Sequence, residues 1–158
     1  MPQTATFVAK VDDRVVGVMS LVIDTPDLGL PSHSSFAAEL DALRAKGRRV
    51  GEVTNLAVED AYRRSNVFFD LARCMFAHAL HVGLDDLFSG VSPGHSEFFQ
   101  TVLQFEPWGE LRSTADNKGD QVEGKRLNLH NLHERLLVKD HMLGKQAFLH
   151  AWFYDDNP

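Results

Sequence analysis

The stretch VTNLAVEDAYRRSNVFF, residues 53–69, most constrains the fold of this chain. A β-patterned run enters a turn with two adjacent arginines and leaves it as an apolar helical stripe that stops at Gly83. A second short apolar run, residues 87–91, follows. Because a strand, a helix and a strand joined over about 30 residues form a crossover, the two strands are expected to be parallel neighbours.

The residues before this crossover predict a hairpin and a short helix. Residues 6–10 and 14–23 flank the turn VDDR, as two paired antiparallel strands do. Apolar residues at positions 36, 40 and 43 lie on one face of a helix, with Ser34 or Ser35 as its cap and Gly47 as its stop.

The residues after the crossover predict a further helix and strand. Ser92 and Pro93 have the residue types of a helix cap and first turn. The polar segment RSTADNKGDQVEGKR is expected to be a loop or hairpin, and residues 127–129 a strand. Together the elements predict an α+β fold with a mixed, mostly antiparallel central sheet, one parallel strand pair and flanking helices.

Composition narrows the function classes. A length of 158 residues with 44% hydrophobic content suits one domain with a substantial core. The net charge of −6 argues against a nucleic-acid binder, and no apolar run or leader pattern predicts stable membrane insertion or export. A cytoplasmic protein is expected. Cys74 has no second cysteine to pair with and is expected to be a small core side chain.

Two segments carry a family resemblance. GEVTNLAVEDAYRR resembles the central motif of the GNAT acyltransferase superfamily, in which a strand ending in LAV enters a turn with YR and then a helix. GHSEFFQTVLQFEPWG resembles the family's later helix and next strand. Within the superfamily the chain most resembles the long-chain N-acyl amino acid synthases, which are related to acyl-homoserine-lactone synthases. The likeness extends from Phe7 to about Leu129.

The resemblance implies one GNAT-like acyltransferase domain over residues 1–158 that lacks the N-terminal strand and helices of the family. Those elements help to close the acceptor pocket and cover one sheet edge in the family. An uncovered apolar edge invites pairing, so either the sequence is truncated or another subunit covers this edge, and a homodimer is one candidate.

The arginine turn departs from the acetyl-CoA enzymes of the superfamily. Those enzymes place glycines where this chain has Arg64, Asn66 and Phe68, so that backbone N–H groups surround the pyrophosphate of CoA. A single phosphate still fits, because the helix that begins near Asn66 offers free N–H groups and Arg63 and Arg64 add charge. The expected donor is therefore acyl-phosphopantetheine on an acyl carrier protein, or acyl-CoA, with no tightly bound cofactor.

A basic patch would suit an acidic carrier protein. Six basic residues near the crossover strand are expected to form it: Arg44, Lys46, Arg48, Arg49, Arg63 and Arg64.

The strand that is predicted over residues 49–58, before the arginine turn, also carries the candidate catalytic residues. Glu52 lies among apolar residues, where desolvation raises the pKa of a carboxylate and suits it to accept a proton from an amine. The resemblance points to the same residue. The structural alternative is that Glu52 pairs with Arg48, Arg49 or a backbone group.

Other site residues follow from this placement. A backbone N–H near Leu56 or Ala57 is the expected oxyanion donor, and Val58 is expected to pair with the amides of pantetheine. Thr54 and Asn55 are candidates for substrate contact. His95, at a helix start, is a candidate proton relay or carboxylate ligand, and the alternative is a half-exposed surface histidine. His33 in the loop GLPSHSS is a weaker candidate of the same kind.

No metal site is expected. The segment HNLHE, with His130, His133 and Glu134, and the later His141 do not have the spacing of a zinc-binding helix and are expected on a polar surface.

The sequence therefore predicts an N-acyltransferase that moves a long-chain fatty acyl group from an acyl carrier protein to the amine of an amino acid. Two alternatives stay open: an acetyl-CoA-dependent GNAT enzyme acting on a small amine, and a noncatalytic module that binds an acyl carrier.

Overall fold

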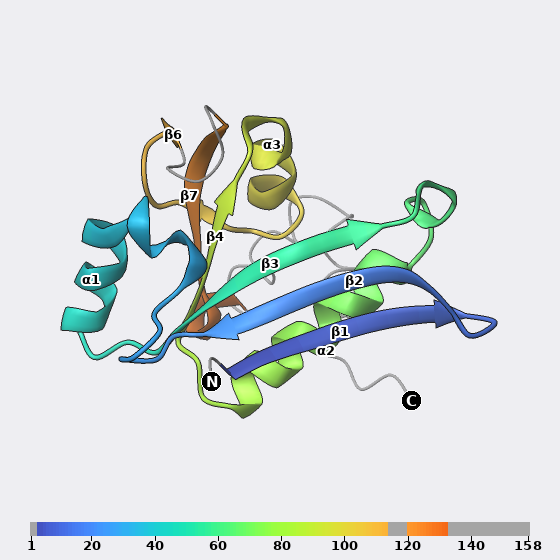
Figure 1. The fold of residues 1–158 in the computed structure, drawn as a ribbon, viewed down its shortest axis with the longest axis horizontal. Helices are drawn as coiled ribbons and strands as arrows, with labels where there is room; N and C mark the ends of the chain where they lie inside the picture. Colours follow the sequence, from blue (N-terminus) through green and yellow to red (C-terminus); the bar gives the residue numbers. More distant parts are fainter. Residues whose placement is uncertain (1–2, 114–119, 133–158) are drawn as a thin grey trace.

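The computed structural model describes residues 3–113 and 120–132. Within these ranges the centre is a seven-stranded sheet with the order β1-β2-β3-β4-β7-β5, and β6 pairs with β7 outside this order (Figure 1). The strands are β1 (Gln3–Val11), β2 (Arg14–Ile23), β3 (Val50–Val58), β4 (Asp86–Val91), β5 (Glu106–Pro107), β6 (Arg112–Ser113) and β7 (Gln121–Asn128). The α-helices are α1 (Ala37–Ala45), α2 (Val67–His81) and α3 (Pro93–Thr101), with short 3-10 helices η1 (Pro31–Ser34) and η2 (Asp60–Tyr62). The predicted α+β fold is confirmed.

β1 and β2 form the predicted hairpin. Asp12 and Asp13 at its turn have φ angles of 49° and 63°. Two-residue hairpin turns require such positive angles, and short polar side chains tolerate them. β1 ends the sheet, and no described strand pairs with its outer edge.

The first helix begins later than its sequence indicated. Residues 31–34 form η1, and the residue before α1 is Phe36 rather than Ser34 or Ser35. The prediction of a serine cap was wrong because Pro31, which lacks an N–H, starts a 3-10 turn that includes Ser34. The predicted stop is confirmed, since Gly47 has a φ of 70°.

The predicted crossover is also present. β3 and β4 are parallel neighbours, and α2 between them packs across β1, β2 and β3. The apolar stripe of α2 is buried, and Gly83 follows the helix with a φ of 77°. Cys74 is exposed, which corrects the expectation of a core position. Its neighbour Met75 takes the buried face of the helix.

Two cores cover opposite faces of the sheet. One joins α2 and α3 to inward residues that include Leu21, Val53 and Leu87. The other joins α1 and the loop before it to Val50 and Phe88. Because successive strand residues point to opposite faces, Glu52 lies on the α1 face, next to the α2-facing Val53.

The last described strand, β7, begins six residues before the predicted residues 127–129 and ends at Asn128, so Leu129 lies outside it. Its antiparallel pairing with β6 confirms the hairpin that was one of the two expectations for residues 112–126. β4 is paired with β7 along the whole length of β4, from Asp86 to Val91, and β6 pairs with the start of β7. Polar residues such as Glu123 and Lys125 lie on the α3 side of β7, so the strand lacks the apolar alternation that would identify it.

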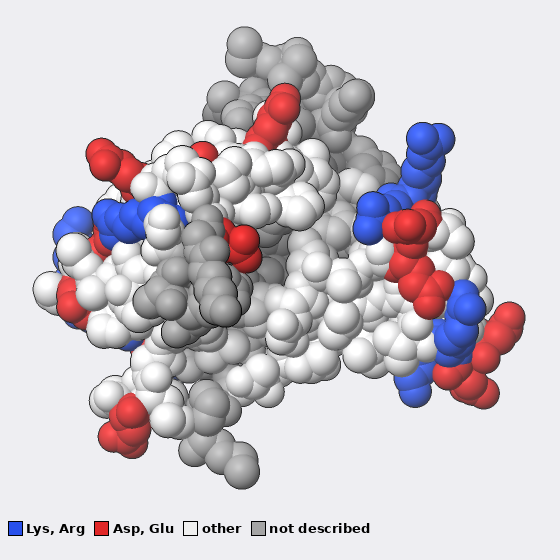
Figure 2. Space-filling view, turned by 45° about the horizontal axis from the view of Figure 1, so that its top comes forward, with Lys and Arg blue, Asp and Glu red and all other residues white. Residues whose placement is uncertain are grey.

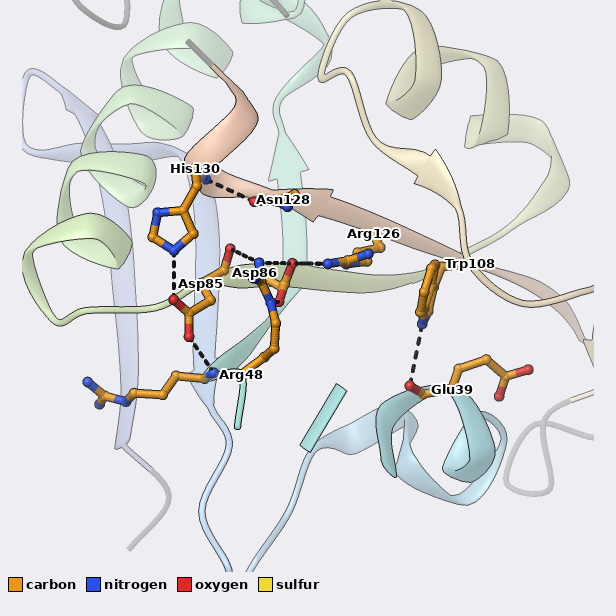
Figure 3. A network of polar contacts seen from close by, with 9 residues as sticks. Glu39, Arg48, Asp85, Asp86, Trp108, Arg126, Asn128 and His130 are labelled. Atoms are coloured by element: carbon orange, nitrogen blue, oxygen red, sulfur yellow. Dashed lines mark hydrogen bonds and ion pairs between the residues drawn. The ribbon is translucent and has the colours of Figure 1, made fainter. Parts of the chain in front are cut away.

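An ionic cluster fixes the end of the sheet where β3 and β4 meet (Figure 3). Asp86 is fully buried and accepts hydrogen bonds from Arg48 Nε at 2.5 Å and Arg126 Nε at 2.9 Å. The Arg126 guanidinium lies 4.6 Å from the ring centre of Trp108. The cluster therefore ties the residues before β3 to β4 and β7.

Candidate functional site

β3 and β4 separate after three residue pairs. Their parallel pairing runs from Val50 opposite Asp86 to Glu52 opposite Phe88, and the two strands then diverge (Figure 1). A bulge between β2 and β3 accompanies the separation: Asn55, with a φ of 51°, lies where the register shifts. A bulge bends and twists its strand and leaves a residue unpaired, which explains why β3 turns away from β4.

A first cavity of about 310 Å³ lies in the gap between the strands. Its walls come from β3, the C-terminal part of β4 and the first two turns of α3. The lining residues are Val53, Thr54, Asn55, Leu56, Ser89, Gly90, Val91, Ser92, His95, Phe98 and Phe99.

A second cavity of about 470 Å³ continues towards the start of α2. Its lining residues are Leu56, Ala57, Val58, Arg63, Ser65, Phe68, Phe69, His95 and Phe98. Leu56, His95 and Phe98 line both cavities, so the two adjoin, and together we call them the β3–β4 cleft. Apolar and aromatic side chains form much of its walls, and Arg63 lines its polar end near the start of α2.

The polar end of the cleft has the features of an anion site. Asn66 precedes α2 without a side-chain cap, and the Val67 N–H donates to the Ser65 Oγ at 3.3 Å, so the N–H groups available to a ligand are those that follow Val67 in the first turn. Arg63 is 70% exposed and pairs with the exposed Asp60 at 2.9 Å. Arg64 is exposed and has no ion-pair partner among the described residues. Of the predicted phosphate contacts, only Arg63 lines the cavity, and Arg64 and Asn66 lie beside it.

Glu52 lies at the closed end of the gap and is 3% exposed. Its carboxylate accepts hydrogen bonds from the Ser32 N–H at 3.0 Å and the Ser32 Oγ at 2.5 Å. Burial raises the pKa of Glu52, and the two hydrogen bonds from Ser32 oppose that rise. The structural alternative is confirmed for a backbone group, since the Ser32 N–H bonds to Glu52, and is wrong for the two arginines. Arg48 bonds to Asp86, and Arg49 bonds to the Asp85 carboxylate and the Val82 carbonyl.

Three predicted residues on β3 and α3 face the first cavity. Thr54 and Asn55 line it from β3, and His95 lines it from the first turn of α3. His95 is exposed, and its Nδ1 lies 2.9 Å from the Ser92 Oγ. Leu56, Ala57 and Val58 line the second cavity, as expected for the donor side. The roles of these residues stay predictions.

Among the lining residues, Ser89 had no signal in the sequence, and Phe98 had only the apolar period of its helix. Ser89 donates a hydrogen bond from its Oγ to the Val53 carbonyl at 3.1 Å, across the point where the strands separate. Phe98 packs edge-on to Phe68 with ring centres 5.0 Å apart and joins α3 to α2 beside the cleft. Both contacts join segments that are far apart in the sequence, so no local sequence pattern could predict them.

The other histidines do not join this site. His33 is partly exposed and lies 3.4 Å from Asp41. His130 lies 2.7 Å from Asp85, and His133, Glu134 and His141 are outside the described residues. Within residues 3–113 and 120–132, no three metal-ligating side chains come together.

The six basic residues do not form one patch, which corrects that prediction. Arg44, Lys46, Arg48 and Arg49 precede β3, whereas Arg63 and Arg64 follow it, and a nine-residue strand separates the two groups by about 30 Å. Arg44 is paired with Asp24 at 2.6 Å and Arg48 with Asp86 at 2.5 Å. Figure 2 shows Lys and Arg side chains in separate groups at opposite sides of one face.

The bulge at Asn55 gives a stability prediction. Asn55→Val is expected to lower the free energy of unfolding by about 1–3 kcal/mol, because a β-branched residue is strained at positive φ. Asn55→Gly should keep the bulge and the stability of the wild type, since glycine adopts this conformation freely. Urea unfolding measures both variants. Equal stability of the valine variant would show that the bulge is absent in solution.

None of the described helices combines the length and apolar composition that crossing a bilayer demands.

The family model for the N-acyl amino acid synthase FeeM matches residues 1–124. No curated protein matches the chain significantly.

Solved structures share the fold. FeeM, an N-acyl amino acid synthase from uncultured soil microbes, is 26% identical, with a TM-score of 0.71 over 82% of this chain and 75% of that chain. A proposed GNAT-family acetyltransferase from Desulfovibrio desulfuricans is 15% identical, with a TM-score of 0.54 over 80% of this chain and 69% of that chain. The CoA-dependent acyl-homoserine lactone synthase BjaI is 19% identical, with a TM-score of 0.54 over 84% of this chain and 64% of that chain.

Proposed function

The chain belongs to the N-acyl amino acid synthase family and is an N-acyltransferase, and we propose that it moves a fatty acyl group from an acyl carrier protein to the amine of an amino acid. The β3–β4 cleft carries this proposal. It consists of two adjoining cavities with apolar and aromatic walls, and Arg63 lines it near the start of α2. An acylated phosphopantetheine arm carries an anionic phosphate at one end and an apolar acyl chain at the other, so its phosphate would lie at the α2 end.

The arm would lie along β3. The phosphate would contact the N-terminal N–H groups of α2 with Arg63 and Arg64, where the helix dipole and two guanidiniums favour an anion. The pantetheine amides would pair with the backbone of Ala57 and Val58, which line the same cavity. The thioester would then lie in the first cavity, beside the bulge at Asn55.

The choice of a carrier protein over CoA rests on the turn before α2. Residues 59–69 contain no glycine, and the side chains of Arg64 and Asn66 would crowd a backbone wrapped around a pyrophosphate. Acyl-CoA is the alternative donor, because the similar synthase BjaI is described as CoA-dependent.

Acyl transfer needs a neutral amine and a donor to the oxyanion. A backbone N–H at the bulge, near Leu56, would hold the oxygen of the tetrahedral intermediate. Glu52 would accept the proton that the amine nitrogen loses as its bond to the carbonyl carbon forms. The C–S bond then breaks, the amide is released, and the protonated Glu52 returns a proton to the departing thiolate.

A matrix of donors and acceptors tests the proposal. The purified protein is incubated with acyl carrier protein or CoA, each loaded with acetyl or long acyl chains, and with the common amino acids, and products are identified by mass. A long-chain N-acyl amino acid formed faster from the carrier donor is the expected result. Product from acetyl-CoA alone would contradict the proposal and support the small-amine acetyltransferase instead.

The turn arginines give a kinetic prediction. The Arg63→Ala, Arg64→Ala double variant is expected to raise KM for the acyl carrier donor about tenfold with little change in kcat, since charge-assisted contacts to phosphate are lost. The dependence of KM on salt should also weaken. Arg14→Ala is the matched control, because Arg14 is a nearby exposed arginine that pairs with Glu59 outside the cleft. Unchanged kinetics of the double variant would exclude this turn as the phosphate site.

The homodimer also remains a proposal. The terminal position of β1 supports it, together with the 50% exposure of Val8 on that strand. Sedimentation velocity measures the oligomeric state directly, and a monomer at all protein concentrations would contradict pairing through β1.

A further inference from the structure

The buried position of Glu52 leaves a gap in the proposed reaction. Its side chain is 3% exposed, so it is almost entirely shielded from anything bound in the β3–β4 cleft. An amine in the cleft therefore cannot touch this carboxylate directly. Another group has to carry the proton between them.

Ser32 is the group in contact with the carboxylate. It lies in η1, twenty residues before Glu52 in the sequence, and bonds to both carboxylate oxygens. The backbone N–H reaches Oε2 at 3.0 Å, and the Oγ reaches Oε1 at 2.5 Å. The backbone bond fixes the position of the loop, so the hydroxyl is held against the base. Ser32 itself is partly exposed.

Gly90 places this hydroxyl at the wall of the cleft. Gly90 lines the first cavity, and a Cβ built on it would lie 2.9 Å from the Ser32 Oγ. The hydroxyl thus lies directly over the β4 backbone at the cavity wall, where a side chain on residue 90 would exclude it. The hydroxyl therefore lies between the buried carboxylate and Gly90 of the cavity wall. Ser32 is behind that wall rather than among the residues that line the cavities, but unlike Glu52 it is partly exposed.

We propose that Ser32 is a catalytic residue that relays the amine proton to Glu52. The relay rests on the proposed acyl transfer. As the amine nitrogen bonds to the thioester carbon, its proton passes to the Ser32 Oγ while the serine proton passes to Glu52 Oε1. The serine ends unchanged, and the carboxylate becomes a carboxylic acid. The same path in reverse delivers the proton to the thiolate that leaves.

Other ionisable groups around Glu52 are engaged elsewhere. Arg48, from the segment before β3, and Asp86, from β4, bond to each other. On the η1 and α1 side, His33 lies against Asp41. His95 faces the cleft from α3, and its Nδ1 lies at the Ser92 hydroxyl. Ser32 is thus the described side chain that links Glu52 to the cavity wall.

Single-turnover acyl transfer across a pH series tests the relay in three variants. Ser32→Ala is expected to lower the rate about 10²-fold with little change in acceptor KM, because general acid–base transfer is lost while the cleft is unchanged. Its pH profile should move to higher pH, since the pKa of Glu52 rises further without the serine hydroxyl. Ser32→Thr keeps a hydroxyl and should recover most of the rate. Ser34→Ala, an exposed serine of the same η1 turn, is the matched control.

A proton inventory in mixtures of H₂O and D₂O gives a second measurement. Two protons move together in the relay, so the rate of the wild type should depend on the deuterium fraction along a curve, and that of Ser32→Ala along a line. A Ser32→Ala rate within twofold of the wild type, beside an impaired Glu52→Gln, would overturn the relay and leave the acyltransferase function intact. A wild type that forms no product from any donor would overturn both. Thermal unfolding of each variant confirms that the fold is retained.

Discussion

Glu52→Gln is expected to lower kcat by about 10²- to 10⁴-fold while the protein stays folded. Glutamine has the same shape, and its side-chain amide can still accept a hydrogen bond from the Ser32 N–H. It cannot accept a proton from an amine. Single-turnover transfer with the acyl carrier donor measures the loss. Glu59→Gln, an exposed glutamate just after the same strand, is the control and should retain the rate.

The same variant is expected to change how stability depends on pH. Burial raises the pKa of Glu52 above its ordinary value of 4.5, so the folded state holds this proton more tightly than the unfolded state does. The wild type therefore loses stability as pH rises from the ordinary value through the raised pKa, and Glu52→Gln does not. At neutral pH the variant should be at least as stable as the wild type. Urea unfolding at a series of pH values decides this, and a marked loss of stability at neutral pH would contradict the assignment.

Asp86→Ala should have the largest effect on stability. Two guanidiniums, from Arg48 and Arg126, share this fully buried carboxylate, and removing it leaves both without their counter-charge (Figure 3). Breaking a buried ion pair in this way costs about 3–5 kcal/mol. The free energy of unfolding in urea gives the value.

An exposed ion pair serves as the comparison for Asp86. Asp41→Ala removes a carboxylate that is 60% exposed and pairs with Arg44 on the surface of α1, and stability should change little. If the two variants lose the same stability, the cluster at Asp86 does not hold β3, β4 and β7 together. Because that cluster lies at the paired ends of β3 and β4, from which the two strands diverge to form the β3–β4 cleft, a folded Asp86→Ala protein should also show a lower rate of acyl transfer.

Much of the fold could be predicted because its signals are local. The aspartates of VDDR, the glycines at 47 and 83 and the apolar stripe of α2 each determine the backbone within a few residues, and all of these lie as expected. The start of α1 and the length of β7 could not be predicted in the same way. Pro31 starts a 3-10 turn, and β7 is a strand because β4 and β6 pair with it.

In the candidate site, too, residues placed by local structure could be predicted, and residues placed by long-range contacts could not. Residues 54–58 are consecutive on β3, so recognising the strand was enough to bring them to one cleft. Ser32, Ser89 and Gly90 reach the site through contacts that span twenty to fifty-eight residues of sequence, and no local pattern marks them. For the basic residues, proximity in the sequence was misleading. The two groups lie at opposite ends of the extended strand β3 and therefore do not form one patch.

The sequence by itself determined the order of strands and helices, the parallel crossover and the glycine-free arginine turn, because periodicity and turn chemistry act over a few residues. Apolar neighbours on β3 also predicted the burial of Glu52, but only the tertiary structure decided that its partner is a serine rather than an arginine. Whether a carboxylate is desolvated, and which donor meets it, depends on how η1 and β4 pack over β3, and that packing joins residues that no sequence window contains.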